Sequence, residues 1–161
     1  SGMGDMGRWL RDIRRYWEWK EFLQRLEKDR TNRVLSGVSQ KVVTSEIVLP
    51  VSSSGMDTLP VPKNPAAQKN ELTLESAESM TQFRPETVLD RISPRAAMWI
   101  YTPEDTVVPI EESQSMYQKA LEPKKLVAIE EFKHYELYHG AGFDLVMKNT
   151  LEWFNTYLDN E

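Results

Sequence analysis

The sequence predicts an α/β fold in which a short parallel sheet is covered by helices. Residues 96–101 form an apolar run between two prolines, which is typical of a short strand buried on both faces. Residues 125–130 form a second β-prone run, and residues 110–121 between them have the spacing of a polar–apolar helix. Because crossovers between parallel strands are right-handed, we expect this strand–helix–strand segment to place both strands in one parallel sheet.

An acid and a histidine follow these two predicted strands. Asp105 lies in the turn after the first strand, and His134 lies in the loop after the second. Because the carboxyl ends of parallel strands meet at one edge of a sheet, we expect a hydrogen bond between the two side chains. In nucleophilic hydrolases a carboxylate orients an imidazole, and the imidazole takes a proton from a serine or cysteine. The pattern therefore predicts Asp105 and His134 as catalytic residues, with Glu104 and His139 as the alternative acid and base.

This part of the chain resembles the carboxyl-terminal region of α/β hydrolases, in which the acid also precedes the histidine. The resemblance rests on DTVVP at 105–109, on the helix that follows it and on the histidine loop. The phrases LESAE at 74–78, FRPE at 83–86 and RISP at 91–94 are similar to fungal hydrolases of polyketide pathways, of the thiohydrolase and polyketide-transferase type. The resemblance covers residues 7–158 and implies a partial (truncated) α/β-hydrolase fold, with a short parallel sheet, helices and a helical cap segment.

The chain departs from this family at the nucleophile. None of its seven glycines begins a G-x-S-x-G nucleophile elbow, and the sequence has no cysteine. In the family, the nucleophile and the oxyanion-hole loop precede the region that the strand–helix–strand segment matches. We therefore expect an acid and a histidine without the third member of a triad, and no ordinary serine-hydrolase activity in the isolated chain.

The sequence divides into three expected parts. Residues 1–6 are a tail that begins with Ser-Gly before a methionine, as a tag remnant does. Residues 7–72 contain a cap- or lid-like helix and a long loop. Residues 73–161 are the carboxyl-terminal hydrolase portion.

The helix of the cap segment is expected over residues 7–30, where apolar side chains recur at steps of three and four. One interpretation is that its aromatic side packs on the domain. The resemblance places this segment in the cap of the hydrolase fold, and it implies that Trp9, Tyr16 and Trp17 contact an apolar substrate. The arginines of this helix favour either a solvated face or an acidic partner.

The remaining elements are expected in order along the chain. Residues 42–49 are β-prone and predict a strand or an extended arm, and residues 52–70 predict a proline-bearing loop. Thr73 is expected to cap a helix over 74–82, and a second helix begins at Pro85 and continues to about residue 91. A glycine-rich break then precedes a final helix over 143–158. Its apolar stripe is expected to cover the sheet, and is formed by Phe143, Met147, Leu151, Phe154 and Leu158.

Composition narrows the class of protein. The net charge of −5 argues against nucleic-acid binding, and no apolar run is long enough to span a bilayer. The absence of cysteine fits a reducing compartment, so we expect a cytoplasmic protein. No metal-ligand spacing is present, and we expect neither a metal nor a cofactor. The expected ligand is a small apolar or acyl substrate.

Three interpretations of function stay open. The chain is the cap and carboxyl-terminal half of an esterase, thioesterase or acyltransferase, with the nucleophile on a separate or missing amino-terminal piece. Alternatively, it is a short protein in which His134 and Asp105 act as a general base in a cyclisation or isomerisation. The third interpretation is a non-catalytic binding or scaffold partner.

The small number of predicted strands also implies a partner. An open α/β sheet usually has about five or six strands. The apolar edge at 96–101 is therefore expected to lie in a homodimer or in a contact with an amino-terminal hydrolase half. Light scattering measures this, and a stable monomer near 18.7 kDa would contradict it.

Overall fold

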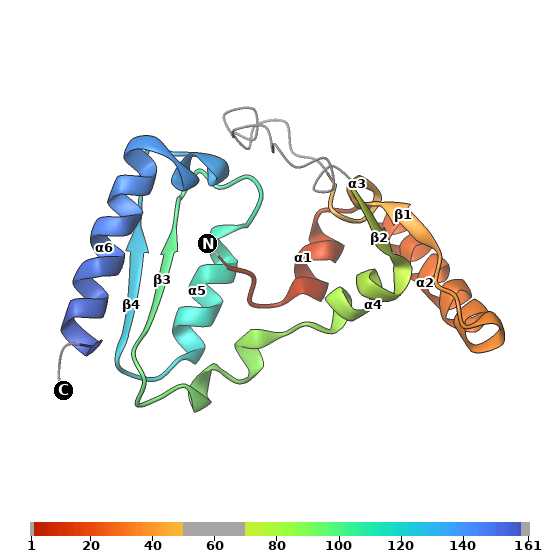
Figure 1. Ribbon diagram of the computed structural model, residues 1–161, viewed down its shortest axis with the longest axis horizontal. Coiled ribbons are helices and arrows are strands. Elements are labelled where there is room, and N and C mark those ends of the chain that lie inside the picture. Colours follow the sequence, from red (N-terminus) through yellow and green to blue (C-terminus); the bar gives the residue numbers. More distant parts are fainter. Residues whose placement is uncertain (1, 50–69, 159–161) are drawn as a thin grey trace. The chain divides into compact units, whose positions relative to one another are not determined.

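The computed structural model describes residues 2–49 and 70–158, which form two compact units (Figure 1). The first, here called the sheet unit, contains residues 2–4 and 85–158 of the described chain. The second, the helical unit, contains residues 5–49 and 70–84. None of the described helices is both long enough and apolar enough to cross a membrane.

The sheet unit contains the predicted strand–helix–strand segment. Strands β3 (Ala97–Tyr101) and β4 (Lys124–Ala128) pair in parallel, in register from Ala97 with Lys124 to Tyr101 with Ala128. Helix α5 (Ile110–Lys119) connects them, and Figure 1 shows α5 and α6 (Gly140–Leu158) flanking the strand pair on opposite sides. The predicted parallel pairing and the α/β fold class are confirmed.

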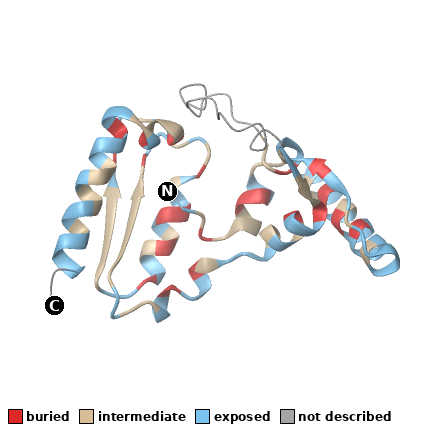
Figure 2. Ribbon diagram, viewed as in Figure 1, coloured by how far each residue is buried: buried red, intermediate tan, exposed pale blue. Residues whose placement is uncertain are grey.

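The core of this unit lies under α5. Leu89, Met116 and Ala120 are buried together, with Ile92 and Trp99 packed against them. Both strands are only partly buried along their length, as their tan colour in Figure 2 shows. The prediction that residues 96–101 are buried on both faces is therefore wrong for the described residues. The reason is that a pair of strands offers neighbouring helices a narrow surface to cover.

Helix α6 differs from the prediction at its start and in its buried face. It begins at Gly140 instead of residue 143, and Gly142 is its one buried residue. Of the predicted sheet-covering stripe, Phe143, Leu151, Phe154 and Leu158 are exposed, and the helix is largely pale blue in Figure 2. The described residues therefore bury only part of the apolar surface of α6 and leave the rest exposed.

Short 3₁₀ helices replace the helix that the sequence predicts from Pro85 to about residue 91. They are η3 (Pro85–Thr87) and η4 (Leu89–Arg91), which Val88 separates. A third, η5 (His134–Tyr138), connects β4 to α6 and carries the histidine.

The helical unit combines four helices with a two-stranded antiparallel ribbon. Its elements are α1 (Met6–Asp12), α2 (Tyr16–Ser36), β1 (Lys41–Val43), α3 (Thr44–Ile47), β2 (Glu71–Thr73) and α4 (Leu74–Gln82). Strand β1 pairs with β2, and α4 packs against both α1 and α2. From the sequence, α4 is expected in the carboxyl-terminal portion that begins at residue 73. In the structure α4 contacts the helices α1 and α2 of the cap-like segment. The boundary between the two units lies after residue 84.

The single helix predicted over residues 7–30 is divided at residues 13–15. Arg15 has an extended backbone, and its amide donates to the Glu18 carboxylate at 2.7 Å, which starts α2. The Arg14 guanidinium donates to the carbonyl oxygens of Leu10 and Ile47, at 2.8 and 2.5 Å. Local capping and this side-chain bridge therefore outweigh the continuous apolar periodicity.

The segments at 42–49 and 74–82 agree with the sequence prediction to different extents. The β-prone run at 42–49 is a strand only to Val43 and then turns into α3, because the Glu46 carboxylate reaches back to the Val43 amide at 3.3 Å. The helix at 74–82 is confirmed with its cap, since Thr73 Oγ1 accepts from the Ser76 amide at 3.1 Å. The loop expected at 52–70 lies outside the described residues apart from Asn70.

Ion pairs fix α2 against α4 within the helical unit. Arg30 Nε donates to Glu78 Oε1 at 2.7 Å, and Arg33 also binds the Glu78 carboxylate. Burial alone would raise the pKa of Glu78, but the hydrogen bonds from Arg30 and Arg33 lower it overall. The buried Asp29 accepts from Ser39 Oγ at 2.8 Å and from the Gln40 amide at 2.7 Å, which anchors the chain as it leaves α2.

Candidate active site

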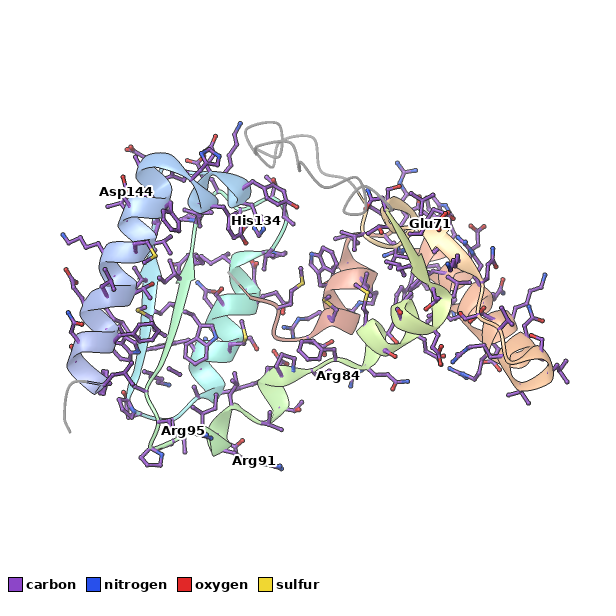
Figure 3. The ribbon with its side chains drawn as sticks, in the orientation of Figure 1. Glu71, Arg84, Arg91, Arg95, His134 and Asp144 are labelled. Carbon is purple, nitrogen blue, oxygen red and sulfur yellow. The ribbon has the colours of Figure 1, made fainter. Side chains whose placement is uncertain are left out.

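The carboxyl ends of β3 and β4 bring Asp105 and His134 into contact. His134 Nδ1 lies 2.8 Å from Asp105 Oδ2, and the two side chains are 9% and 1% exposed. Figure 3 shows His134 at the end of the sheet unit toward which both strands run. The hydrogen bond predicted from the two strand ends is therefore present.

The turn after β3 holds the Asp105 carboxylate in one orientation. The Asp105 amide donates to the Thr102 carbonyl at 3.2 Å, which closes the turn. Asp105 Oδ1 accepts from the amides of Val107 and Val108, at 2.8 and 2.7 Å. An aspartate that bonds to backbone amides two and three residues ahead is a common turn motif, and here it leaves Oδ2 directed at the imidazole.

The loop after β4 is held against the same turn. The Ile129 amide continues the sheet by donating to the Tyr101 carbonyl at 2.8 Å. The hydroxyl of the fully buried Thr102 donates to the Phe132 carbonyl. The Lys133 amide then donates to the Glu136 carboxylate at 2.8 Å, which starts η5 at the histidine. Sequence reasoning did not identify Thr102, although its place directly after the first strand is a usable signal.

The geometry assigns different roles to the two imidazole nitrogens. A neutral imidazole beside a carboxylate carries its proton on Nδ1 and keeps Nε2 as an acceptor. Among the described residues, the ring makes no hydrogen bond other than that to Asp105. Tyr135 and Tyr138 contact the ring edge-on, at centroid distances of 4.7 and 5.7 Å. Burial, the Asp105 carboxylate and Tyr135 raise the pKa of Tyr138, so its phenol stays protonated at neutral pH.

The alternative acid and base do not form this pair. Glu104 is exposed in the turn. The His139 carbonyl accepts from the Phe143 amide at 3.3 Å and belongs to the start of α6. Asp105 and His134 are therefore the residues that the fold brings together.

None of the three serines in the described part of the sheet unit hydrogen-bonds to His134. Ser93 Oγ donates to the Glu122 carbonyl at 2.8 Å, and Ser115 Oγ donates to the Glu86 carboxylate at 2.9 Å. Ser113 is fully buried within α5. These positions leave His134 Nε2 without a serine nucleophile from this unit.

The residues predicted to contact substrate all lie in the helical unit. Tyr16 and Trp17, on the first turn of α2, are 74% and 56% exposed. The Lys20 ammonium lies over the Tyr16 ring, and the Arg15 guanidinium lies over the Trp17 ring. Trp9 is 3% exposed and has little surface to offer a ligand. Substrate contact by these three residues stays a prediction. Among the described residues, no group of three or more carboxylate or histidine side chains is placed to hold a metal ion.

A parallel strand–helix–strand unit with an acid after the first strand and a histidine after the second defines the carboxyl-terminal part of an α/β-hydrolase fold. Several solved structures are similar to this chain over most of its length. The chain is similar to the α/β hydrolase GrgF from Penicillium sp. sh18, with a TM-score of 0.65 and 16% identity over 87% of this chain and 50% of that one. It is also similar to DcsB, solved with its substrate analogue, with a TM-score of 0.69 and 15% identity over 89% and 53% of the two chains.

A third similar structure is the hypothetical protein PA2218 from Pseudomonas aeruginosa, with a TM-score of 0.62 and 19% identity over 92% of this chain and 49% of that one. The chain thus spans about half the length of the solved structures that it matches. No protein-family model and no curated protein matches the sequence. At these identities the likeness shows a partial α/β-hydrolase fold, and the chemistry has to be argued from the site.

Proposed function

We propose that Asp105 and His134 are the acid and the base of an acyl-transfer site of the esterase, thioesterase or acyltransferase type. The observation that carries the proposal is the 2.8 Å contact between His134 Nδ1 and a carboxylate that is 1% exposed. The carboxylate fixes the tautomer and stabilises the imidazolium that forms when Nε2 takes a proton. The two backbone amides that donate to Asp105 Oδ1 hold the carboxylate in place.

In this proposal the attacking hydroxyl or thiol comes from polypeptide other than these 161 residues. The support is chemical: the sequence contains no G-x-S-x-G and no cysteine, and the described serines of the sheet unit are bonded elsewhere or buried. An amino-terminal hydrolase half is the proposed source of this nucleophile, and a homodimer is the alternative partner for the exposed apolar surface. The exposed apolar stripe of α6 and the partly exposed β3 support such an association.

The proposed substrate is a small apolar or acyl compound, and the proposed setting is polyketide metabolism in a fungal cytoplasm. The fungal polyketide setting rests on the sequence phrases at 74–78, 83–86 and 91–94, and the cytoplasmic location rests on the absence of cysteine. A cap that contacts the substrate through Tyr16 and Trp17 is part of it, since both rings are exposed.

A second candidate is a general-base reaction without an acyl-enzyme, such as a cyclisation or isomerisation. Two observations favour it: the Asp105 carboxylate holds the His134 imidazole, and the sequence contains no nucleophile elbow. Here His134 would remove a proton directly from the substrate.

Labelling with a fluorophosphonate tests the absence of a serine nucleophile in the isolated chain. We expect no stoichiometric adduct by mass spectrometry, because no serine in the described sheet unit is activated by His134. A serine hydrolase treated in parallel serves as the positive control. Stoichiometric modification of one serine that disappears on His134→Ala substitution would show that this chain contains its own nucleophile.

A further inference from the structure

The helical unit contains a cavity of about 470 Å³, and neither Asp105 nor His134 is among the residues that line it. It is lined by residues of α1, α2 and α4, by Asp5 directly before α1 and by Arg84 after α4. Its volume lies within the range of about 300–1,000 Å³ that is typical of small-molecule sites. The side chains that give it chemical character are Asp5, Arg8, Arg11, Trp19, Leu23 and Arg84.

Basic side chains outnumber acidic ones in the lining of this cavity. Its wall carries three guanidinium groups, from Arg8, Arg11 and Arg84, and one carboxylate, from Asp5. The Asp5 carboxylate is shared, because Oδ1 accepts from the Arg8 amide at 2.8 Å and Oδ2 lies 3.4 Å from Arg84 Nε. Arg11 pairs with its neighbour Asp12 at 2.9 Å through Nε, which leaves the two terminal nitrogens of that guanidinium outside the pair. Among the residues that line the cavity, guanidinium groups therefore outnumber carboxylates by three to one.

Aromatic and aliphatic side chains form the other part of the wall. Trp19 and Leu23 are four residues apart on α2 and so lie on one face of the helix. Trp19 is half-buried and its ring packs at 5.6 Å from that of Phe22, which limits its rotation. Leu23 is 38% exposed. A ligand in the cavity would meet cationic donors on one side and an apolar surface on the other.

A close backbone contact holds the walls in position. A Cβ atom at Gly7 would lie 2.5 Å from the Thr81 carbonyl oxygen, so α1 and the last turn of α4 touch at a distance that only glycine permits. The Met6 amide also donates to the Phe83 carbonyl at 3.0 Å, directly before Arg84. The backbones that carry Arg8 and Arg84 are thus fixed relative to each other, which reduces the entropy cost of ligand binding.

We propose that this cavity binds a small organic anion in which a phosphate or carboxylate group is joined to an aromatic or other apolar group. The planar guanidinium groups match the oxygen atoms of phosphate and carboxylate. The Trp19 and Leu23 side chains take the apolar part of the ligand. The proposal goes beyond the acyl-transfer function and does not depend on it.

Calorimetric titration of the full chain with small compounds tests this proposal. Phenyl phosphate and benzoate carry both features, and comparing them distinguishes a phosphate ligand from a carboxylate ligand. Inorganic phosphate lacks the ring, phenol lacks the charge, and benzylamine has the opposite charge. We expect saturable binding of phenyl phosphate or benzoate, at least about tenfold tighter than that of the other three, and weaker at high salt.

Paired substitutions locate the binding site. The double variant Arg11→Gln/Arg84→Gln is expected to weaken binding at least about tenfold. Arg15→Gln is the matched control, because Arg15 is exposed in the same unit and does not line the cavity. The proposal would be overturned if the unaltered chain bound phenol or benzylamine as tightly as phenyl phosphate or benzoate. It would also be overturned if neither phenyl phosphate nor benzoate showed saturable binding. An equal loss of affinity in Arg15→Gln would assign the binding to general positive charge and contradict this cavity.

Discussion

Replacement of His134 by alanine is expected to lower the rate of acyl transfer by at least about 100-fold, the low end of the contribution of general acid–base catalysis. The reason is that His134 Nε2 is the ring nitrogen that the 2.8 Å bond to Asp105 leaves available to accept a proton. The assay supplies the missing nucleophile as a small molecule. It measures acyl transfer from p-nitrophenyl acetate to added cysteamine, after subtraction of the rate without protein.

The chain offers a matched control for each member of the pair. His139→Ala removes the other histidine, which contributes its carbonyl to the start of α6, and should change the rate little. Asp105→Asn should lower the rate at least about tenfold, whereas Glu104→Gln, at the exposed neighbour, should not. Equal rates for the unaltered chain and His134→Ala would remove His134 from the mechanism.

Substitution of Gly142 by alanine is expected to destabilise the protein by about 1–3 kcal/mol, the usual cost of overpacking. A Cβ atom at this position would lie 2.5 Å from the Glu136 carbonyl oxygen and 3.0 Å from Phe132 Cδ1. Glu136 belongs to η5, the short helix that begins at His134. Because α6 and η5 would have to separate, we also expect a change in the chemical shifts of the His134 ring.

Gly37→Ala is the matched control for the added methyl group. Gly37 has φ = 73°, and among the described residues beyond its chain neighbours no atom lies within 4 Å of the position that a Cβ atom would take. This change should cost about 1 kcal/mol through the left-handed backbone conformation alone. Chemical denaturation measures both costs, and NMR reports the His134 ring. An unchanged His134 spectrum in a folded Gly142→Ala protein would contradict the role of this contact in positioning the histidine.

The sequence predicts best those elements whose signal is local. The apolar run that became β3, and the Thr73 cap of α4, depend on residue types and nearest neighbours, and both are present. The division of the first helix at Arg14 depends on a bond to the Ile47 carbonyl, 33 residues away, which periodicity does not record. Strand β2 was not predicted either, because it is three residues long and is defined by its partner β1.

The same distinction holds for the site. Asp105 and His134 could be predicted together because each follows a strand, and parallel pairing then places both at one edge. The place of Thr102 directly after a strand is a signal in the sequence, but its bond to the Phe132 carbonyl is visible only in three dimensions. The same holds for the close approach of Gly142 to the Glu136 carbonyl. The exposed stripe of α6 shows a further limit: an apolar pattern identifies a surface that needs a partner without showing what covers it.

The most direct test of the central claim is the tautomer of His134, measured by ¹⁵N-correlated NMR of the imidazole in the unaltered chain and in Asp105→Asn. The buried Asp105–His134 pair predicts that the neutral ring carries its proton on Nδ1 and leaves Nε2 unprotonated. It also predicts that Asp105→Asn shifts the proton toward Nε2. A neutral His134 ring that carries its proton on Nε2 in the unaltered chain, or a spectrum that Asp105→Asn does not change, would contradict the assignment of this pair as the acid and base of the site.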